Sequence, residues 1–283
     1  MSEPSLRDRI EQYYATVPLL FAEAEEFGVL RLFVRKRSGA PYYGGPYHAR
    51  PGSTGPLTAV TADIARVRAR QRELGVPEAF EWLAEVTPSL RARIEAAGLP
   101  VAERPLMVLP ALHPLPPQPL TEGVTIRTVP ADDPALPAVL AIPELAFAAE
   151  GMAVGSAGRA ELATVAEKLT ADGTVATIRP ALAVGHKVLV AAFSPDGTPL
   201  AAGHYHPANG TTEIGGIGTL PSARRQGLGA AVTVALAAHA RDHGVHTVFL
   251  AYAENAVARL YTRLGFRSAG TTLLISNQPA RGQ

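Results

Sequence analysis

The second half of the chain alternates between apolar stretches and turn-forming segments, in a way that predicts a sheet built from hairpins. The segments that separate the apolar stretches, 194–198 and 207–210, are rich in Pro, Gly, Asn and Asp. Such segments form tight turns, so consecutive strands should pair antiparallel. The three strands expected here are Val188–Phe193, Leu200–His206 and Thr212–Thr219.

After the third strand the spacing of the core-facing residues changes to that of a helix. Core-facing residues recur at helical spacing from Leu228 to His239, and Gly244 then ends the helix. Thr247–Ala251 follows as a buried strand, and a further helix and strand come after it. The pattern of strands followed by helix, strand, helix and strand predicts an α/β fold with a mixed sheet.

Upstream of the hairpins, the pattern predicts one more strand and two helices. The strand is Val124–Val129, and the helices are Asp132–Ala148 and Arg159–Thr170. Pro134, Pro137 and Pro143 weaken the first of these helices.

The first half of the chain repeats the second in a weaker form. Between Arg31 and Thr61, where a phosphate-cradling loop would stand in a full copy, there is only the aromatic stretch Pro41–Tyr47. We therefore expect a degenerate repeat without a cofactor. Its expected elements are a helix through Ile64, Val67 and Leu74, the strand Ala79–Val86, the helix Ser89–Ala97 and the strand Pro105–Leu109.

A dense run of prolines separates the two halves. Seven prolines fall between Pro100 and Pro119, which favours an extended, semi-rigid chain. We therefore expect a degenerate lobe at 1–112, a linker at 113–121 and a catalytic domain at 122–283.

The amino-acid composition limits the classes of protein to which this chain can belong. With 47% hydrophobic residues, 18% charged residues and a net charge of +1, the chain is expected to be a globular protein, and nucleic acid is not an expected partner. It contains no cysteine, which excludes disulfides, thiolate metal sites and a cysteine nucleophile. The charged N-terminus does not resemble a secretion signal, and no apolar run is long enough to cross a bilayer. We expect a cytoplasmic protein without a membrane partner.

The strongest chemical signal is the segment Arg224–Gly229, which lies directly between a predicted strand and a predicted helix. The first N–H groups of a helix have no intrahelical partner and lie at the positive end of its dipole. Glycines let an anion approach this main chain, and arginine adds charge-assisted bonds. No Lys-Ser or Lys-Thr follows the glycines, and the strand order is mixed, which disfavours a P-loop and a dinucleotide-binding unit.

Three motifs in this order resemble those of the GCN5-related N-acetyltransferases (GNAT superfamily). They are R-x-x-G-x-G at 224–229, Leu260-Tyr261 and Leu264-Gly265-Phe266, and the resemblance covers roughly residues 122–275. It implies acetyl-CoA as cosubstrate, held at the helix start and along the preceding strand, and it implies no metal. The residues that it assigns to the coenzyme are Ile217, Gly218, Thr219, Arg224, Arg225, Gln226, Gly227, Leu228, Gly229, Ala230 and Asn255.

The resemblance also suggests the acid and the base. Tyr261 would protonate the leaving thiolate, and Glu213 resembles the acidic residue that many members carry on this strand. The usual asparagine of the family stands seven residues before the tyrosine, where this chain has Glu254; Asn255 stands six before it. The asparagine contact is therefore shifted or lost, and Asn255 is also a plausible helix cap.

Two histidines lie close to Glu213 in the expected sheet. Hairpin register places His204 or His206 opposite Glu213, so these side chains could line a substrate pocket. A metal site from the two histidines is disfavoured, because histidines on a strand are more often solvated or stacked. His239, His243 and His246 are expected to cap a helix end or to reach solvent. Four arginines, Arg66, Arg68, Arg70 and Arg72, are expected to form a solvated helix face.

Together these features predict an N-acyltransferase that moves an acetyl group from coenzyme A to a primary amine of a small molecule by direct attack. Two alternatives remain: a sensor of acyl-CoA or of a small molecule without turnover, and aminoacyl transfer from tRNA on the same fold. The segment Phe147–Ala183 is expected to shape the acceptor pocket, with the first lobe as a second candidate contributor. The oligomeric state is open, with a homodimer as one possibility.

Overall fold

The computed structural model describes residues 4–36, 49–51, 60–149, 151–253 and 255–276, and divides the chain into two compact units. The first unit comprises 1–106, 251–253 and 268–283, and the second comprises 107–250 and 254–267. This division differs from the limits expected from the sequence. The last strand of the chain belongs to the first unit, and residues 107–121 belong to the second.

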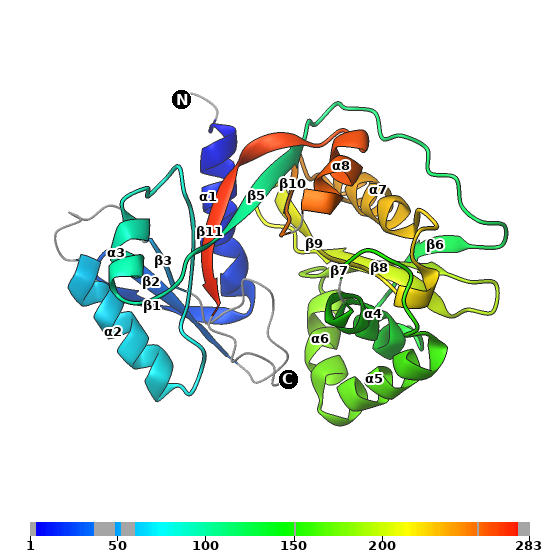
Figure 1. Ribbon diagram of the computed structural model, residues 1–283, viewed down its shortest axis with the longest axis horizontal. Coiled ribbons are helices and arrows are strands. Elements are labelled where there is room, and N and C mark those ends of the chain that lie inside the picture. Colours follow the sequence, from blue (N-terminus) through cyan, green and yellow to red (C-terminus); the bar gives the residue numbers. More distant parts are fainter. Residues whose placement is uncertain (1–3, 37–48, 52–59, 150, 254, 277–283) are drawn as a thin grey trace. The chain divides into compact units, whose positions relative to one another are not determined.

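The first unit is a mixed sheet with the strand order β1-β2-β3-β4-β11 (Figure 1). β1 and β2, β2 and β3, and β4 and β11 pair antiparallel, whereas β3 and β4 run parallel. Its elements are α1 (Leu6–Thr16), η1 (Val17–Leu20), β1 (Ala22–Phe27), β2 (Leu30–Arg35), β3 (Ala49–Pro51), α2 (Val60–Glu73), β4 (Ala79–Leu83), α3 (Leu90–Ala96) and β11 (Arg267–Ser276). β5 (Ala102–Leu109) crosses the division between the units.

The two faces of this sheet are closed differently. On one face, the apolar sides of α2 and α3 pack on a core that includes Phe80, Trp82 and Leu273. On the other face, Arg50 is only 1% exposed, and its guanidinium lies 4.5 Å from the ring centroid of Tyr14 and 3.3 Å from the carboxylate of Glu11. A buried charge must be paired, so α1 supplies the partners that let Arg50 lie inside the unit.

The second unit is a mixed sheet with the order β6-β7-β8-β9-β10, and helices cover both of its faces (Figure 1). β6 to β9 pair antiparallel in sequence, and β9 and β10 run parallel. Its elements are β6 (Thr125–Thr128), α4 (Leu136–Ala148), α5 (Arg159–Ala171), α6 (Thr174–Ala183), β7 (Val188–Phe193), β8 (Pro199–Tyr205), β9 (Thr211–Thr219), η3 (Pro221–Ala223), α7 (Leu228–Asp242), β10 (Thr247–Ala251) and α8 (Asn255–Arg263).

The hairpins expected from the sequence are confirmed. β7 and β8 pair antiparallel, as do β8 and β9, and Asn209 and Gly210 at the second turn have φ values of 50° and 67°. Such positive φ values suit the tight turns that join antiparallel strands. The mixed α/β class and the partial repeat are also confirmed, because β1-β2-β3-α2-β4-α3 in the first unit follows the same order as β7-β8-β9-α7-β10-α8 in the second.

Alternation along the strands of the second unit assigns side chains to its two faces. A Cβ atom added at Gly203 would meet Leu236 of α7, whereas one added at Gly218 would meet Ala146 of α4. Odd-numbered positions of β8 therefore face α7, and His204 faces the side covered by α4. These two faces are called the α7 face and the α4 face below.

Several expectations for helices and strands were wrong in detail. The helix expected from Asp132 begins at Leu136, because the Asp133 carboxylate accepts hydrogen bonds from the N–H of Ala135 and from Arg127 and so holds a turn before the helix. The helix α6 was not expected, since Pro180 and four β-branched residues lower its helix propensity. The strands β1 and β2 and the helix α1 were also missed.

Candidate active site

The loop between β9 and α7 exposes the start of a helix. Arg225 and Gly227 have φ values of 70° and 75°, and this pair of left-handed residues turns the chain from η3 into α7. The N–H of Ala231 donates to the carbonyl of Gly227 at 3.1 Å, so the N–H groups of Leu228 and Gly229 lie before the first helical bond. Nothing lies within 4 Å of the position that a Cβ of Gly227 would occupy, so the main chain here is accessible.

Arg224 does not present its guanidinium to this helix start. The side chain is 8% exposed and donates to four main-chain carbonyls that follow α4 or end it. Nη1 lies 2.9 Å from the oxygen of Gly151 and 3.1 Å from that of Ala153, and Nη2 lies 2.7 Å from the oxygen of Ala146 and 3.4 Å from that of Ala149. Protein carbonyls thus occupy the donors of Nη1 and Nη2, whereas the sequence led us to expect these donors at the coenzyme.

The segment after α4 is fastened to the same loop by main-chain bonds. The N–H of Gly155 donates to Pro221 and the N–H of Ser222 donates to Ala157, each at 3.0 Å. Phe147, Met152 and Val154 in or beside this segment are exposed, with Phe147 at 69%. Exposed apolar side chains thus stand next to the loop that precedes α7.

The strands β9 and β10 pair over only a short distance. Their register runs from Thr211↔Thr247 to Glu213↔Phe249, whereas β9 continues to Thr219. The residues from Ile214 onward thus extend beyond the described pairing with β10. An unpaired strand edge offers main-chain donors and acceptors to an extended ligand.

A β-bulge lies in β9 where this pairing ends. The register with β8 shifts between Ala202 and His204, and Gly216 has a φ of 62°. A Cβ at Gly216 would lie 2.7 Å from the His204 ring, and a Cβ at Gly215 would lie 3.6 Å from it. Glycines at both positions therefore let the His204 ring lie directly over the bulge.

Tyr261 lies on α8 with its side chain 8% exposed. Its ring centroid is 5.9 Å from that of Phe266. Burial raises the pKa of the phenol to about 12. The hydroxyl therefore keeps its proton throughout the neutral pH range.

Glu213, His204 and His206 share the α4 face, as the register expectation required. Tyr205 pairs with Ile214 and Ala208 bridges to Thr211, so His206 lies opposite Glu213, while His204 pairs with Gly215. His206 is 1% exposed, whereas His204 is partly exposed. Of the two histidines, His204 is the one that a ligand can reach.

Sequence reasoning missed Lys187, which lies just before β7. Its ammonium nitrogen is 3.5 Å from Nε2 of His206 inside the protein. Burial lowers the pKa of Lys187 to about 7. The available signal was its position, a lone charged residue directly preceding the apolar strand Val188–Phe193.

Other candidate residues lie outside the described residues or have structural partners. Glu254, the side chain of Asn255 and the stretch Pro41–Tyr47 lie outside what the structure describes. On α7, Nδ1 of His239 lies 2.8 Å from the Tyr205 hydroxyl, and Nδ1 of His243 donates to the His239 carbonyl at 2.7 Å, close to the helix end.

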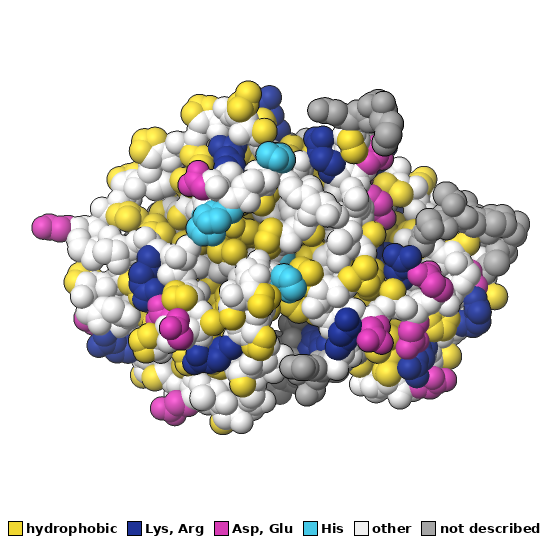
Figure 2. Space-filling view, turned by 180° about the vertical axis from the view of Figure 1, so that it is seen from behind, with side chains coloured by type: hydrophobic (Ala, Val, Ile, Leu, Met, Phe, Trp, Pro, Cys, Tyr) yellow, Lys and Arg dark blue, Asp and Glu magenta, His cyan; other side chains and the backbone are white. Residues whose placement is uncertain are grey.

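The four arginines of α2 form ion pairs within the first unit. Arg68 and Arg72 contact Glu78, Arg70 contacts Glu25 and Glu73, and Arg66 contacts Asp63. On the face shown in Figure 2, basic and acidic side chains are interspersed. Paired arginines of this kind do not form the unneutralised stripe that binds phosphate backbones.

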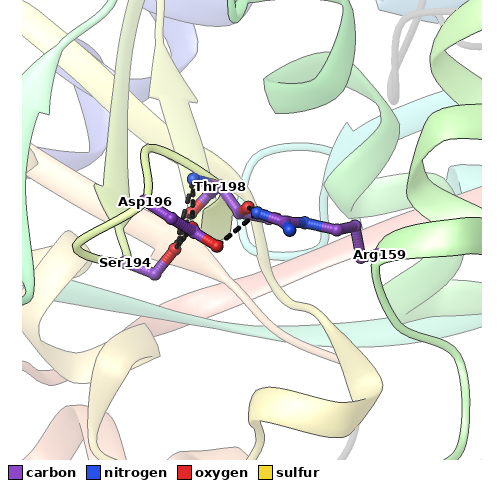
Figure 3. Close-up of polar contacts among 4 residues, drawn as sticks. All are labelled: Arg159, Ser194, Asp196 and Thr198. Atoms are coloured by element: carbon purple, nitrogen blue, oxygen red, sulfur yellow. Dashed lines mark hydrogen bonds and ion pairs between the residues drawn. The ribbon is translucent and has the colours of Figure 1, made fainter.

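A second polar cluster fastens the turn between β7 and β8 to α5 (Figure 3). Arg159 contacts Asp196 and Thr198, and the Ser194 hydroxyl donates to Asp196 at 2.5 Å. Hydrogen bonds from Ser194 and Thr198, followed by the charge of Arg159, lower the pKa of Asp196. The hollow of about 260 Å³ beside this cluster includes Arg159, Leu162 and Ala163 from the segment in which the acceptor pocket was expected, but none of the expected catalytic or coenzyme residues. The cluster therefore serves to hold α5 in place.

The described part of the chain carries neither a metal-binding cluster nor a membrane-spanning helix. Within the described ranges, no group of three or more His, Cys, Asp or Glu side chains is arranged to hold a metal ion. Likewise, none of the helices described is both long and apolar enough to pass through a bilayer.

Comparisons with known proteins agree with this geometry. The model of the acetyltransferase (GNAT) family matches residues 167–266. This match spans β7 to α8, and so includes the bulge, the start of α7 and Tyr261. No curated protein gives a significant match.

Three solved structures share the fold at low sequence identity. A GCN5-related N-acetyltransferase from Kribbella flavida is 20% identical with a TM-score of 0.68, and the alignment covers 98% of each chain. One from Sphaerobacter thermophilus is 20% identical with a TM-score of 0.55, covering 81% of this chain and 71% of that one. A tandem GNAT protein from the clavulanic acid biosynthesis pathway is 18% identical with a TM-score of 0.56, covering 90% and 79%.

The family match falls on the second unit, and the similarity of fold extends over both units. The match to this family indicates acyl transfer in general. Residues 167–266 therefore match the acetyltransferase (GNAT) family, and the chain has the two-lobed GNAT fold of these structures, complete in its second unit and partly repeated in its first.

Proposed function

We propose that the protein transfers an acyl group, acetyl in the simplest case, from coenzyme A to a primary amine of a small molecule. The observation that carries the proposal is the start of α7, which follows a strand whose pairing with β10 ends early. Main-chain N–H groups from Arg225 to Ala230 would hold the coenzyme diphosphate. The edge of β9 at Ile217, Gly218 and Thr219 would pair with the extended pantetheine arm as an added strand.

The residues at the helix start fit such a ligand. Gly227 leaves open space beside the main chain, and Arg225 and Gln226 are exposed. The positive end of the α7 dipole favours two negative phosphates at this place. Arg224 would act indirectly, because its bonds to the segment after α4 fix the loop from behind.

Tyr261 would serve as the general acid. When the amine attacks the thioester, the departing thiolate needs a proton, and the phenol holds one at neutral pH. A phenol pKa of about 12 is higher than that of a thiol in water, at about 8.5. The buried setting that disfavours the phenolate also disfavours the thiolate, which reduces the difference between the two groups.

Glu213 would serve as the base or as part of a base relay. Primary amines are mostly ammonium ions at neutral pH, so a proton must leave before the nitrogen can attack. Glu213 lies at the last described pair between β9 and β10, beside the unpaired edge where the thioester would lie. Direct attack needs no covalent enzyme intermediate.

The acceptor would carry an apolar group. Phe147, Met152 and Val154 are exposed beside the loop that precedes α7, and Arg224 holds their segment there. These side chains would bury apolar surface of the acceptor, at about 25 cal/mol for each Å² removed from water.

The experiment is a thiol-release assay with acetyl-CoA and a panel of primary amines. The panel should pair arylalkylamines with diamines and polyamines, and mass spectrometry should identify the acetylated product. Release of thiol that depends on the amine, strongest for apolar amines, is the expected result. Coenzyme binding by calorimetry without thiol release would point to a sensor, and the absence of coenzyme binding would remove the proposal.

A further inference from the structure

A row of ionisable side chains crosses three strands on the α4 face. Val188 pairs with Tyr205, and Tyr205 pairs with Ile214. One step further along, the same registers place Lys187, His206 and Glu213 side by side. The row begins in the interior at Lys187 and ends at Glu213, beside the unpaired edge of β9.

Hydrogen-bond partners determine which ring nitrogen of His206 carries the proton. Its Nδ1 lies 2.7 Å from the carbonyl of His186, and a carbonyl can only accept, so Nδ1 carries the proton. Nε2 is then the acceptor, 3.5 Å from the Lys187 nitrogen. The hydroxyl of Thr212 donates to the carbonyl of His206 at 2.8 Å and holds the backbone of this residue. His206 is therefore occupied on both ring nitrogens and buried.

His204 lies two residues before His206 on the same face, but it is partly exposed whereas His206 is buried. The two rings meet edge to face, with centroids 5.3 Å apart. The His204 ring is partly exposed and lies over Gly215 and Gly216, where β9 bulges and its pairing with β10 has ended. An acyl group carried along this edge of β9 would pass beneath the ring.

The electrostatic surroundings of His204 favour the neutral imidazole. Burial lowers its pKa well below the ordinary value, followed by the charges of Lys187 and His206. Glu213 is the acidic group on the same face, and His186 lies next to Lys187 in the chain. The helices on this side add Glu144 in α4, which pairs with Lys168, and Arg179 in α6, which donates to the carbonyl of Ala131.

We propose that the His204 imidazole accepts the proton that the ammonium group of the acceptor loses before attack. Lys187 and His206 are positioning residues, Lys187 through its charge and His206 through its edge-to-face contact with the His204 ring. The inference rests on the proposed acyl transfer and specifies its base. Glu213 then supplies the negative charge that offsets the imidazolium once it forms.

The proton balance is complete within the site. The acceptor R–NH₃⁺ gives one proton to His204, and the lone pair of the nitrogen forms the C–N bond as the C–S bond of the thioester breaks. The thiolate takes the proton of the Tyr261 phenol, and the nitrogen returns its second proton to the phenolate. His204 releases its proton to solvent, so the net products are amide, thiol and one proton.

The first test compares His204→Gln with His239→Gln in the full chain. His239 contacts Tyr205 on the α7 face, so it controls for the loss of a histidine beside β8. With acetyl-CoA and the best amine of the panel, His204→Gln should lower kcat/KM about 100-fold near pH 7, the usual contribution of a general base. His239→Gln should leave kcat/KM within about threefold.

The second test uses Lys187→Met, and its first readout does not depend on turnover. Removal of the nearby cation should raise the pKa of His204 by about one unit, seen by NMR titration of ¹⁵N-labelled histidine rings assigned with His204→Gln. The acidic limb of kcat/KM should move to higher pH by the same amount, because activity requires the neutral ring.

The outcomes separate the two proposals. Wild-type turnover that His204→Gln leaves unchanged would overturn the role of His204 and keep the acyl transfer. An unchanged His204 titration in Lys187→Met would overturn the role of Lys187. Absence of wild-type turnover with every amine would overturn the proposed function, and the assignment of the base with it.

Discussion

The two units share the same order of strands and helices. They differ in the residues carried by the first strand of their parallel pair, which is β3 in the first unit and β9 in the second. In the first unit this strand is β3, where the buried Arg50 is matched by Glu11 and stacked on Tyr14 from α1. In the second unit it is β9, which carries four glycine or threonine residues around its bulge and leads to the exposed start of α7. In the first unit, side chains from α1 pack against β3. In the second unit, the backbone of β9 is accessible.

This difference shows that topology alone does not make the site. Both units pair their central strands antiparallel, antiparallel and then parallel. The proposed chemistry depends on small residues on β9, on left-handed residues before α7 and on a buried phenol on α8. Four substitutions test how far this contrast holds: three change the second unit, two of them with a matched control variant, and the fourth changes the first unit.

The largest expected effect comes from Tyr261→Phe. Loss of the proton donor should lower kcat about 100-fold or more, while the dissociation constant of the coenzyme stays the same. Steady-state kinetics and calorimetry give the two numbers. A kcat within about threefold of wild type would remove Tyr261 from the mechanism.

Arg224→Met should destabilise the second unit. It removes the donors for four carbonyls around the end of α4, which should lower the free energy of unfolding by about 2–3 kcal/mol. Denaturant unfolding measures the change. The control is Arg225→Met, an exposed neighbour, which should change stability by less than about 0.5 kcal/mol. Equal effects of the two changes would contradict the structural role of Arg224.

Gln226→Glu should weaken coenzyme binding without affecting the fold. A carboxylate at the exposed start of α7 would repel the diphosphate and raise the dissociation constant about tenfold, equivalent to about 1.4 kcal/mol. Gln12→Glu on α1 adds the same charge to the other unit and should leave binding unchanged. Calorimetry that found no difference between the variants would place the diphosphate elsewhere.

Arg68→Met should have the smallest effect. Arg68 contacts Glu78 at 2.8 Å and the carbonyl of Ala97 at 2.7 Å, so its loss should cost about 1 kcal/mol of stability. Coenzyme affinity should not change, because these contacts lie within the first unit. A clear loss of affinity would show that the degenerate lobe takes part in binding.

The parts of the fold that could be predicted are those in which local signals agree. The turns at 194–198 and 207–210 and the apolar spacing of α7 specified the hairpins and the following helix without further information. β1, by contrast, has the sequence AEAEEF, which lacks apolar alternation and forms a strand only because β2 pairs with it. Its strand conformation comes from this pairing and not from an apolar pattern of its own, so the sequence pattern did not reveal it.

The candidate site divides in the same way. The glycines and the tyrosine could be found because their roles depend on backbone freedom and on spacing along the chain. The direction of the Arg224 side chain could not be predicted from the sequence, because the carbonyls that accept its hydrogen bonds lie 71–78 residues earlier in the chain. The Lys187 contact likewise depends on the register between β7 and β8.

The place of β11 has a consequence for how the protein is made. This strand pairs with β4 from Thr272↔Leu83 to Ser276↔Ala79, and so completes the sheet of the first unit with residues from the far end of the sequence. During synthesis β1 to β4 leave the ribosome long before β11 does. The edge of β4 that pairs with β11 therefore stays unpaired until the end of the chain has been made. Separate expression of residues 1–112 would leave that edge permanently exposed, and aggregation of the fragment is the expected result.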